Sequence, residues 1–287
     1  MREHLVKNHP CLGGEAHKKF GRLHLPVSPA CNIQCNFCKR DCNSNEERPG
    51  VANGILQPKD AVDTVKRALE LCPEITVVGI AGPGDTLATN NAIETFKLVD
   101  KAYPNLIKCL STNGLLLYKK YKEIYDSGVR TITVTVNAVD PEIQNDITSY
   151  IVYEGKVIHG IEGAKILIEN QLKGIRAISS LGVVVKVNSV LIPGINSEHI
   201  EEIARTVKEA GASLYNIIPL IPQHDLSHIH APDCIELDKA RRDGEKHLEV
   251  FRHCKHCRAD ACGIPGEKDL SKELYGTNLA LETFSHG

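Results

Sequence analysis

Three cysteines lie within the short string CNIQCNFC, at Cys31, Cys35 and Cys38. Thiolates bind soft metals, and this Cys-x3-Cys-x2-Cys spacing lets three of them bind three irons of a 4Fe–4S cluster. The fourth iron then has no protein ligand and can bind a substrate, as the open position of a catalytic zinc does. A zinc site completed by a distant His or Cys is the alternative that the spacing alone leaves open.

Further potential metal ligands are distributed along the chain, which has 11 cysteines and 13 histidines. The candidates are Cys11 in the string HPC, His24, Cys42, Glu46, Cys109, and the pair Cys254 and Cys257 in the string HCKHC. Their close spacing beside His and Glu favours metal binding over packing. The Cys-x2-Cys pair is typical of both zinc and iron–sulfur sites. We interpret Cys72, Cys234 and Cys262 as structural, because free cysteine packs as a small hydrophobe.

Glycines and polar residues at the ends of predicted strands form a second group of candidates. They are Gly82, Gly84 and Asp85 in IAGPGDTLA, Ser111, Thr112 and Asn113, Thr135 and Asn137, and Asn188. Glycine allows backbone to approach a ligand closely, and a polar side chain in an apolar strand needs a hydrogen-bonding partner. A cofactor at the strand ends would supply that partner, although backbone or water can serve at any single position.

Alternating β-rich and amphipathic segments predict the elements that carry these residues. Strands are predicted at 23–28, 75–82, 107–114, 131–138, 183–191 and 214–221. Helices are predicted at 58–72, 90–103, 118–127, 159–179, 197–211 and 235–252. Such alternation indicates an α/β fold with a parallel sheet and right-handed crossovers. Six units are two short of a closed barrel, so a partial TIM-like barrel and an open doubly wound sheet both fit. In this scheme His24 begins the first strand.

The bulk composition excludes several classes of protein. The chain has 287 residues and a formal net charge of −2, which indicates neither nucleic-acid nor membrane-surface binding. No apolar stretch approaches the roughly 18 residues of a membrane span, and MREHLVKNHPCLGG lacks the apolar core of a signal peptide. We therefore expect a cytoplasmic protein with reduced thiols rather than a disulfide framework.

The three-cysteine motif, with the aromatic Phe37 before its last cysteine and a predicted strand before it, resembles that of the radical S-adenosylmethionine (SAM) superfamily. The resemblance implies a (βα)6 radical SAM barrel whose open iron binds the amino and carboxylate groups of SAM. It also places Phe37 and the strand-end residues named above around SAM. One electron from the cluster then splits SAM into methionine and a 5′-deoxyadenosyl radical.

Strings along nearly the whole chain resemble the NifB family, the radical SAM maturases of the nitrogenase cofactor. They are HPC (9–11), EAH (15–17), PACNIQCNFC (29–38), RPGV (48–51), AGPGD (81–85), LSTNG (110–114), VTVNAVDP (134–141) and CxxCRADA (254–261). The resemblance implies fusion of two 4Fe–4S clusters into an eight-iron core around a carbide. One SAM would donate a methyl group to a sulfide, and a second would begin that methyl group's conversion to carbide.

The NifB resemblance also implies which residues bind the two substrate clusters. Cys11, His24 and Cys109 match the ligands of one cluster, and Cys254 and Cys257 match those of the other, with Glu46 as an oxygen ligand. The resemblance does not decide to which cluster Cys42 belongs. Weak ligands such as imidazole and carboxylate suit clusters that must leave.

The same resemblance implies a division of the chain and a set of partners. Residues 1–22 and 253–287 would be Cys-rich, cluster-binding extensions around a barrel at 23–252. Because the sequence stops at Gly287 without the carrier-like domain of some relatives, we expect a separate carrier protein, besides cluster-donor and reductant proteins. The competing hypotheses are a radical SAM enzyme for a peptide or small molecule whose auxiliary clusters only relay electrons, a non-catalytic iron–sulfur scaffold or carrier, and a zinc-stabilised binding module.

Overall fold

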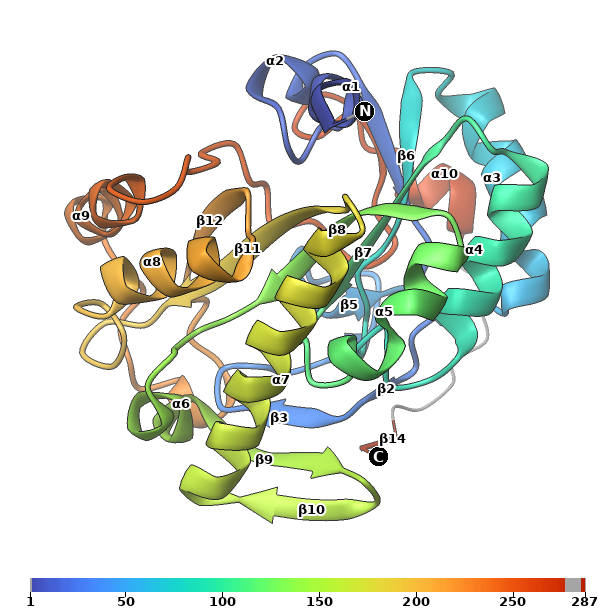
Figure 1. Ribbon diagram of the computed structural model, residues 1–287. Helices are drawn as coiled ribbons and strands as arrows, with labels where there is room; N and C mark the ends of the chain where they lie inside the picture. The colour runs from blue at the N-terminus through green and yellow to red at the C-terminus, as the bar shows by residue number, and fades with distance from the viewer. Residues whose placement is uncertain (1, 277–284, 287) are drawn as a thin grey trace.

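A curved seven-stranded sheet forms the centre of the computed structural model, which describes residues 2–276 and 285–286 (Figure 1). Its strand order is β12-β11-β8-β7-β6-β1-β13. The strands are β1 (Gly21–His24), β6 (Ile75–Ile80), β7 (Ile107–Thr112), β8 (Val129–Thr135), β11 (Val184–Leu191), β12 (Leu214–Pro219) and β13 (Cys262–Gly263). Strands β1, β6, β7, β8, β11 and β12 pair in parallel, whereas β13 runs antiparallel to β1. The six parallel strands confirm the predicted partial barrel, and β13 adds a strand that was not predicted.

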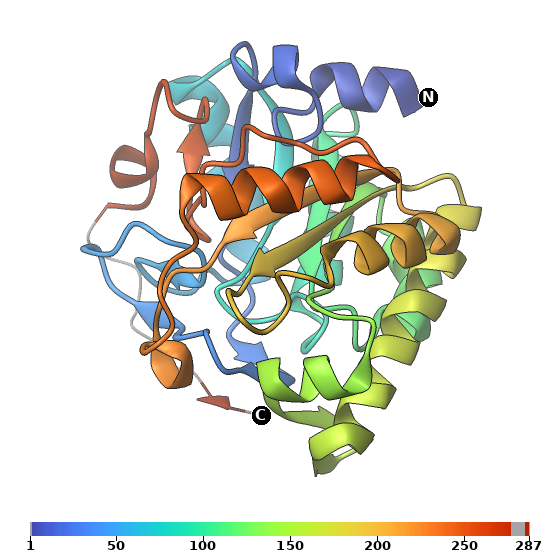
Figure 2. The same ribbon diagram turned by 90° about the vertical axis from the view of Figure 1, so that its left-hand side faces the viewer.

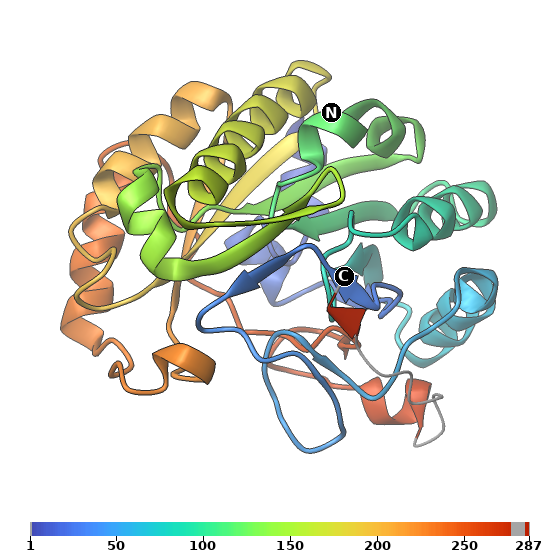
Figure 3. The same ribbon diagram turned by 90° about the horizontal axis from the view of Figure 1, so that it is seen from below.

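Six helices cover the outer face of the sheet, as the view from below shows (Figure 3). They are α3 (Ala61–Leu71), α4 (Asn91–Ala102), α5 (Leu117–Asp126), α7 (Gly160–Ser180), α8 (Ile200–Ala210) and α9 (Cys234–Glu245). Helix α8 illustrates why they pack there: it buries Ile200, Ile203, Ala204 and Val207, which recur every three or four residues on one side. The main core therefore lies between sheet and helices, and the inner face of the sheet is left for other segments.

The predicted helix at 235–252 is too long, since α9 ends at Glu245. Beyond it the chain runs beside β12, where Phe251 N donates to Tyr215 O and Tyr215 N donates to Glu249 O. These bonds satisfy backbone groups that a continued helix would have paired internally. The prediction for His24 is also wrong: this residue ends β1 rather than beginning the strand.

A second small sheet was not predicted. Helix α6 (Pro141–Ile147) leads into the hairpin of β9 (Thr148–Tyr153) and β10 (Lys156–His159), and β3 (Ile33–Cys35) pairs antiparallel with β9. The two-residue turn has positive φ at Glu154 (52°) and Gly155 (76°), as a type I′ turn requires. The hairpin thus holds the segment that carries Cys35.

Short elements at both ends of the chain complete the fold. They are α1 (Arg2–Asn8), α2 (Gly14–His17), β2 (Ala30–Cys31), β4 (Asp41–Cys42), β5 (Val51–Ala52), the 3-10 turns Pro58–Asp60 and His224–Leu226, α10 (Ser271–Tyr275), and β14 (Ser285–His286), which pairs with β2. Figure 2 shows the N-terminal helices beside the segment that follows α9. The division at residues 22 and 252 stays a prediction. None of the helices within residues 2–276 has the length and apolar composition to span a bilayer.

Candidate active site

A cavity of about 370 Å³ lies on the inner face of the sheet. Alternate residues of neighbouring strands line it: Arg22 and His24 of β1, Cys109 and Ser111 of β7, Thr133 and Thr135 of β8, and Lys186 and Asn188 of β11. The residues between them, such as Val185 and Val187, belong to the core under the helices. This follows from the two-residue repeat of a strand, which sends successive side chains to opposite faces.

Cys31, Cys35 and Cys38 are free thiols that line this cavity together. Cys38 N donates to Cys35 O (3.0 Å), and the Gln34 side-chain amide donates to the backbone oxygens of both residues (2.9 and 3.1 Å). Burial raises the pKa of Cys31 to about 11, and burial with the two neighbouring thiols raises the pKa of Cys35 well above its usual value. Coordination to a metal removes this penalty, because a coordinating thiol is deprotonated outright. The three thiols therefore fit an iron–sulfur cluster.

The GPGD turn after β6 packs directly on the segment that leads to Cys31. Gly84 N donates to Ser28 O (2.8 Å) and Asp85 N donates to Ala30 O (2.8 Å). A Cβ atom at Gly84 would lie only 2.1 Å from Ala30 O. The close approach predicted for this glycine is therefore made to the protein's own backbone, and it fixes the position of Cys31.

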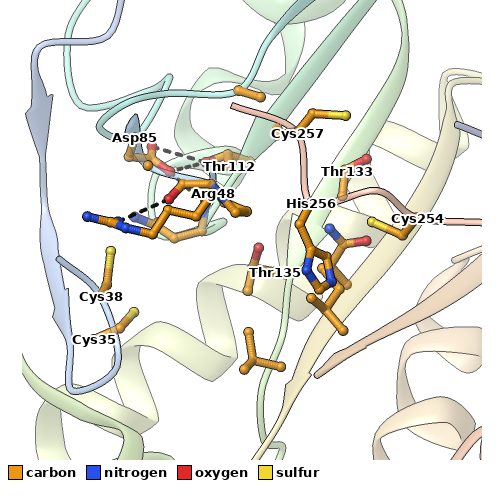
Figure 4. Close-up of a pocket in the computed structure, with 18 of the residues that line it drawn as sticks. Cys35, Cys38, Arg48, Asp85, Thr112, Thr133, Thr135, Cys254, His256 and Cys257 are labelled. Carbon is orange, nitrogen blue, oxygen red and sulfur yellow. Dashed lines mark hydrogen bonds between the residues drawn. The ribbon is translucent and has the colours of Figure 1, made fainter. Parts of the chain in front are cut away.

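Asp85 is buried and accepts hydrogen bonds from three groups. The donors are Leu87 N (2.9 Å), Asn113 N (2.6 Å) and Thr112 Oγ1 (2.9 Å; Figure 4). Burial raises the pKa of its carboxyl group, and these hydrogen bonds oppose that rise. The Asn113 side chain in turn donates to Asn32 Oδ1 (2.7 Å) and lies 3.9 Å from Cys31 Sγ. Asp85 thus orients Asn113 toward the three-cysteine motif.

The other polar residues predicted at strand ends all line the cavity, but some of them have protein partners. Ser111, Thr135, Asn137 and Asn188 belong to the lining, as does Phe37. Asn137 Oδ1 accepts from Val190 N (2.9 Å), and Asn188 Oδ1 accepts from the Asn216 amide (3.1 Å). Their hydrogen-bonding capacity is therefore partly used inside the protein.

His24, Cys11 and Cys109 also line the cavity, which brings together residues far apart in the sequence. His24 Nδ1 lies 3.0 Å from the carbonyl oxygen of Arg258, so Nδ1 carries the proton and donates it. Nε2 is then left with its lone pair, as in most histidines that bind metals. Burial lowers the pKa of His24 to about 4, with Arg22 contributing, so its imidazole is neutral at pH 7. Burial raises the pKa of Cys11 to about 12.

Cys254 and Cys257 face the three-cysteine motif across the cavity (Figure 4). A buried ion pair holds the segment behind them: Arg258 Nε lies 2.9 Å from Asp260 Oδ1. Arg258 also donates to the backbone oxygens of Asn43 (2.8 Å) and Glu46 (2.5 Å), and Asp260 accepts from Asn53 N (2.6 Å). The pair therefore fastens the loop that carries Cys42 and Glu46 to the C-terminal cysteines.

Three predicted site residues do not line the cavity: Gly82, Cys42 and Glu46. The Glu46 carboxylate pairs with Arg48 (2.9 Å) and accepts from the Asn43 amide (2.7 Å), and these bonds lower its pKa. Cys42 is half-buried in β4 on the same loop. Of the cysteines interpreted as structural, Cys72 and Cys262 are buried as predicted, whereas Cys234 is exposed at the start of α9.

Several lining residues were missed at the sequence level. They are His9, Arg22, Arg40, Arg48, Thr133 and Lys186, among others. Arg22 lies two residues before His24, Thr133 two before Thr135, and Lys186 two before Asn188. A charged residue inside an apolar strand, on the same face as a candidate ligand, was the available signal.

Comparisons with known proteins agree with this geometry. The family model described as the Radical SAM superfamily matches residues 25–207. The FeMo cofactor biosynthesis protein NifB of Methanocaldococcus infernus is 50% identical over 98% of this chain and 95% of its own length. NifB of Methanocaldococcus jannaschii is 49% identical over 99% of this chain and 97% of its own length. The chain belongs to the NifB family of radical SAM proteins. It is therefore a radical SAM enzyme, which uses a 4Fe–4S cluster and SAM.

Other relatives and solved structures differ more. NifB of Azotobacter vinelandii is 42% identical over 91% of this chain, which spans 54% of that protein. A radical SAM methyltransferase from Sphaerobacter thermophilus superposes with a TM-score of 0.59 at 16% identity, over 80% of this chain and 65% of that one. Streptococcus suis SuiB superposes with a TM-score of 0.57 at 16% identity, over 87% and 52%. These structures support the partial-barrel fold.

Proposed function

We propose that the protein acts in biosynthesis of the nitrogenase FeMo cofactor, by fusing two 4Fe–4S clusters and inserting a carbide derived from SAM. One observation carries the proposal: a single cavity is lined both by the three-cysteine motif and by Cys11, Cys109, Cys254 and Cys257. In a radical SAM enzyme for a peptide, auxiliary clusters that only relay electrons need not lie in the cavity where the substrate reacts. Four further thiols in the same cavity favour iron–sulfur clusters as the substrate.

In this proposal Cys31, Cys35 and Cys38 hold the SAM-binding cluster. When bound, that cluster supplies the electron that cleaves SAM reductively. The residues proposed to contact SAM are Phe37, Gly82, Gly84, Asp85, Ser111, Asn113, Thr135, Asn137 and Asn188. Of these, Asn113 has a side-chain amide 3.9 Å from Cys31 Sγ, and Asp85 orients it. Gly82 is outside the cavity lining, so it would act through the shape of the GPGD turn.

The two substrate clusters would be held at the opposite side of the cavity. Cys11, His24 and Cys109 are the proposed ligands of one, and the free Nε2 of His24 supports its part in this set. Cys254 and Cys257 are the proposed ligands of the other. Cys42 and Glu46 belong to the loop fastened to Cys254 and Cys257 by Arg258, so we assign both to the second cluster. Glu46 would first have to leave Arg48.

The chemistry requires that one SAM donate its methyl group to a cluster sulfide. A second SAM would then yield the radical that abstracts hydrogen from this methyl group. The protein's own contribution is placement and exclusion of water, because a primary alkyl radical abstracts hydrogen from whatever it meets. The segments 1–22 and 253–287 would serve as cluster-binding extensions, and cluster-donor, reductant and carrier proteins as partners in the cytoplasm.

One anaerobic experiment tests the proposal. The protein is reconstituted with iron and sulfide and given dithionite and SAM, after which 5′-deoxyadenosine, S-adenosylhomocysteine and transferable cofactor precursor are assayed. We expect all three products, and we expect C254A/C257A to lose the precursor. Deoxyadenosine without S-adenosylhomocysteine would point to a radical enzyme for another substrate. Bound clusters with neither product would point to a scaffold, and bound zinc without visible absorption to a zinc-stabilised module.

A further inference from the structure

Within the described part of the chain, two buried cations in the cavity have no carboxylate in an ion pair with them. The buried arginine and lysine side chains of the described residues are Arg22, Arg48, Lys108, Lys186 and Arg258. Three of them form ion pairs, Arg48 with Glu46, Lys108 with Asp100 and Arg258 with Asp260. Arg22 and Lys186 are only 6% and 5% exposed, and neither belongs to any ion pair found within residues 2–276. A buried charge is costly unless something compensates it, so these two cations call for negative charge in the cavity.

The Arg22 guanidinium lies at the sulfur atoms. Its Nη2 donates to Cys257 Sγ (3.3 Å), and its Nη1 donates to Gly263 O (2.6 Å). Its Nε is buried without a hydrogen-bond partner in the described structure. Cys257 and then Cys11, both ahead of the Asp269 carboxyl, raise the pKa of Arg22 against the effect of burial. Arg22 therefore donates to Cys257, a proposed ligand of one substrate cluster, and lies two residues before His24, a proposed ligand of the other, on the same face of β1.

Lys186 is the cation on the Cys11 side. Its Nζ donates to Cys11 O (3.1 Å) and lies 5.4 Å from the centre of the Phe251 ring. Its charge lowers the pKa of both Cys11 and Cys109 against the effect of burial. The two cations thus lie among the thiols of the substrate-cluster sites, with Arg22 at Cys257, Lys186 at Cys109, and Cys11 influenced by both.

We propose that Arg22 is a positioning residue that joins the two substrate-cluster sites, with Lys186 as the counter-charge on the Cys11 and Cys109 side. An N–H···S bond and a nearby positive charge stabilise a thiolate ligand and raise the reduction potential of the cluster it binds. A cation shared by Cys257 and Cys11 also reduces the repulsion between two thiolate-bound clusters that must meet. This inference rests on the proposed function, because it assumes that these thiols bind clusters.

The test uses the C31A/C35A/C38A variant as a parent, so that all bound iron belongs to the substrate clusters. R22Q, R22K, K186M and R130Q are added to it. R130Q is the matched control, because Arg130 is a half-buried arginine outside the cavity that donates to Tyr125 O. After anaerobic reconstitution, we measure iron per chain, the midpoint potential by EPR-monitored redox titration, and the rate of iron loss to a ferrous chelator.

We expect R22Q to lower the midpoint potential and to lose iron about tenfold faster than the parent, the size typical of lost outer hydrogen bonds at metal sites. R22K should have a midpoint potential close to that of the parent, because it keeps the positive charge. It should still lose iron faster, because lysine cannot make both guanidinium hydrogen bonds. K186M should lower the potential of the Cys11 cluster, and R130Q should match the parent.

If R22Q and K186M match R130Q in midpoint potential and in the rate of iron loss, the inference about Arg22 and Lys186 is wrong, but the proposed function is unaffected. A parent that binds no iron would overturn the proposed function and this inference with it. Thermal unfolding of the iron-free proteins identifies a variant that has not folded. K186M carries the test if R22Q is unfolded, since it leaves the backbone pairing of Lys186 with β8 and β12 in place and removes the side-chain bond to Cys11 O.

Discussion

Arg258 serves the candidate site with three different parts of one residue. Its backbone oxygen fixes the His24 tautomer, its guanidinium holds the loop at Asn43 and Glu46, and its charge pairs with Asp260. A change at this pair should therefore affect a proposed ligand on β1 and the loop that carries Cys42 together. The string CRADA was noticed in the sequence only as a family match, and the ion pair gives it a physical role.

We predict that D260N destabilises the iron-free protein by about 3–5 kcal/mol, because removing one partner leaves the buried Arg258 charge uncompensated. The free energy of unfolding is measured by denaturant titration under anaerobic, iron-free conditions. The control is E202Q, which breaks the ion pair between Glu202 and Arg205. Their side chains are 48% and 46% exposed, so this substitution should lower the free energy of unfolding by about 1 kcal/mol or less. Equal losses in the two variants would contradict the role assigned to Arg258 and Asp260.

A second prediction at this scale concerns the loss of stability at low pH as His199 becomes protonated. His199 Nε2 accepts from Val139 N (3.1 Å), and burial lowers the pKa of His199, with Asp140 and Glu202 opposing. Because the folded pKa is below the ordinary value, the unfolded chain binds the proton more readily. This contribution to stability is therefore present above about pH 6.5 and is lost as pH falls through the folded pKa.

The measurement compares unfolding free energies of the iron-free wild type and H199Q at pH 7.5 and pH 5. Gln can accept the same hydrogen bond but does not titrate. We expect the advantage of the wild type to shrink toward pH 5. A difference between the two proteins that is constant with pH would refute the link to His199 protonation.

At the scale of elements, the hairpin β9–β10 supports the three-cysteine motif through the pairing of β9 with β3. Gly155 has φ 76° in its turn, and a side chain there would meet nothing within 4 Å. G155V should therefore act through backbone strain alone, at about 1–2 kcal/mol. We predict weaker binding of the cluster at Cys31, Cys35 and Cys38, seen as faster iron loss from C254A/C257A/C11A protein.

Gly194 offers a matched control for that experiment, because its φ is 77° and its surroundings are equally open. It lies in the turn after β11, whereas β3 pairs with β9. G194V should carry the same strain but leave the iron-loss rate unchanged. If both variants lose iron at the same rate, the hairpin does not support the motif.

The main elements could be predicted from the sequence because each depends on its own residues. Apolar runs and 3.6-residue periodicity located the six parallel strands and their helices within a few positions. The hairpin was missed although YEGK has positive-φ turn chemistry between β-branched residues, and the last helix was drawn too long because Val250 and Phe251 continue an apolar pattern. Their hydrogen bonds with the Tyr215 backbone depend on a strand far away in sequence, which local periodicity cannot report.

The residues of the candidate site could be predicted where a residue type and its spacing are typical of a metal ligand. Cysteine spacing and family strings indicated the thiols, whereas Arg22 and Lys186 have no motif and reach the cavity only through strand alternation. Glu46 illustrates the opposite failure: its carboxylate suits a ligand, yet it pairs with Arg48 outside the cavity lining. Which partner a carboxylate takes depends on the loop's packing against Arg258, a contact across more than 200 residues.

At the scale of the whole molecule, the N-terminal segment and the segment after α9 meet over the sheet. The His17 ring lies 5.6 Å from His253 and 6.0 Å from Phe251, and Lys186 of β11 bonds to Cys11. Ligands from the first residues, from β1 and β7, and from the segment after α9 thus share one cavity. Such a site forms only when the complete fold has formed. The motif of Cys31, Cys35 and Cys38 differs in this respect, because its three thiols lie within eight residues of the sequence.

This arrangement predicts three separable cluster sites. The reconstituted wild type should bind about 12 irons per chain, as three 4Fe–4S clusters require. C31A/C35A/C38A, C11A/C109A and C254A/C257A should each lose about four of them, because each set of thiols belongs to its own cluster. C234A is the control, since Cys234 is an exposed thiol outside the cavity lining, and it should lose none. Loss of all the iron from any one variant would contradict independent sites, whereas loss of about eight from C254A/C257A would mean that the two substrate clusters load together, as a shared Arg22 allows.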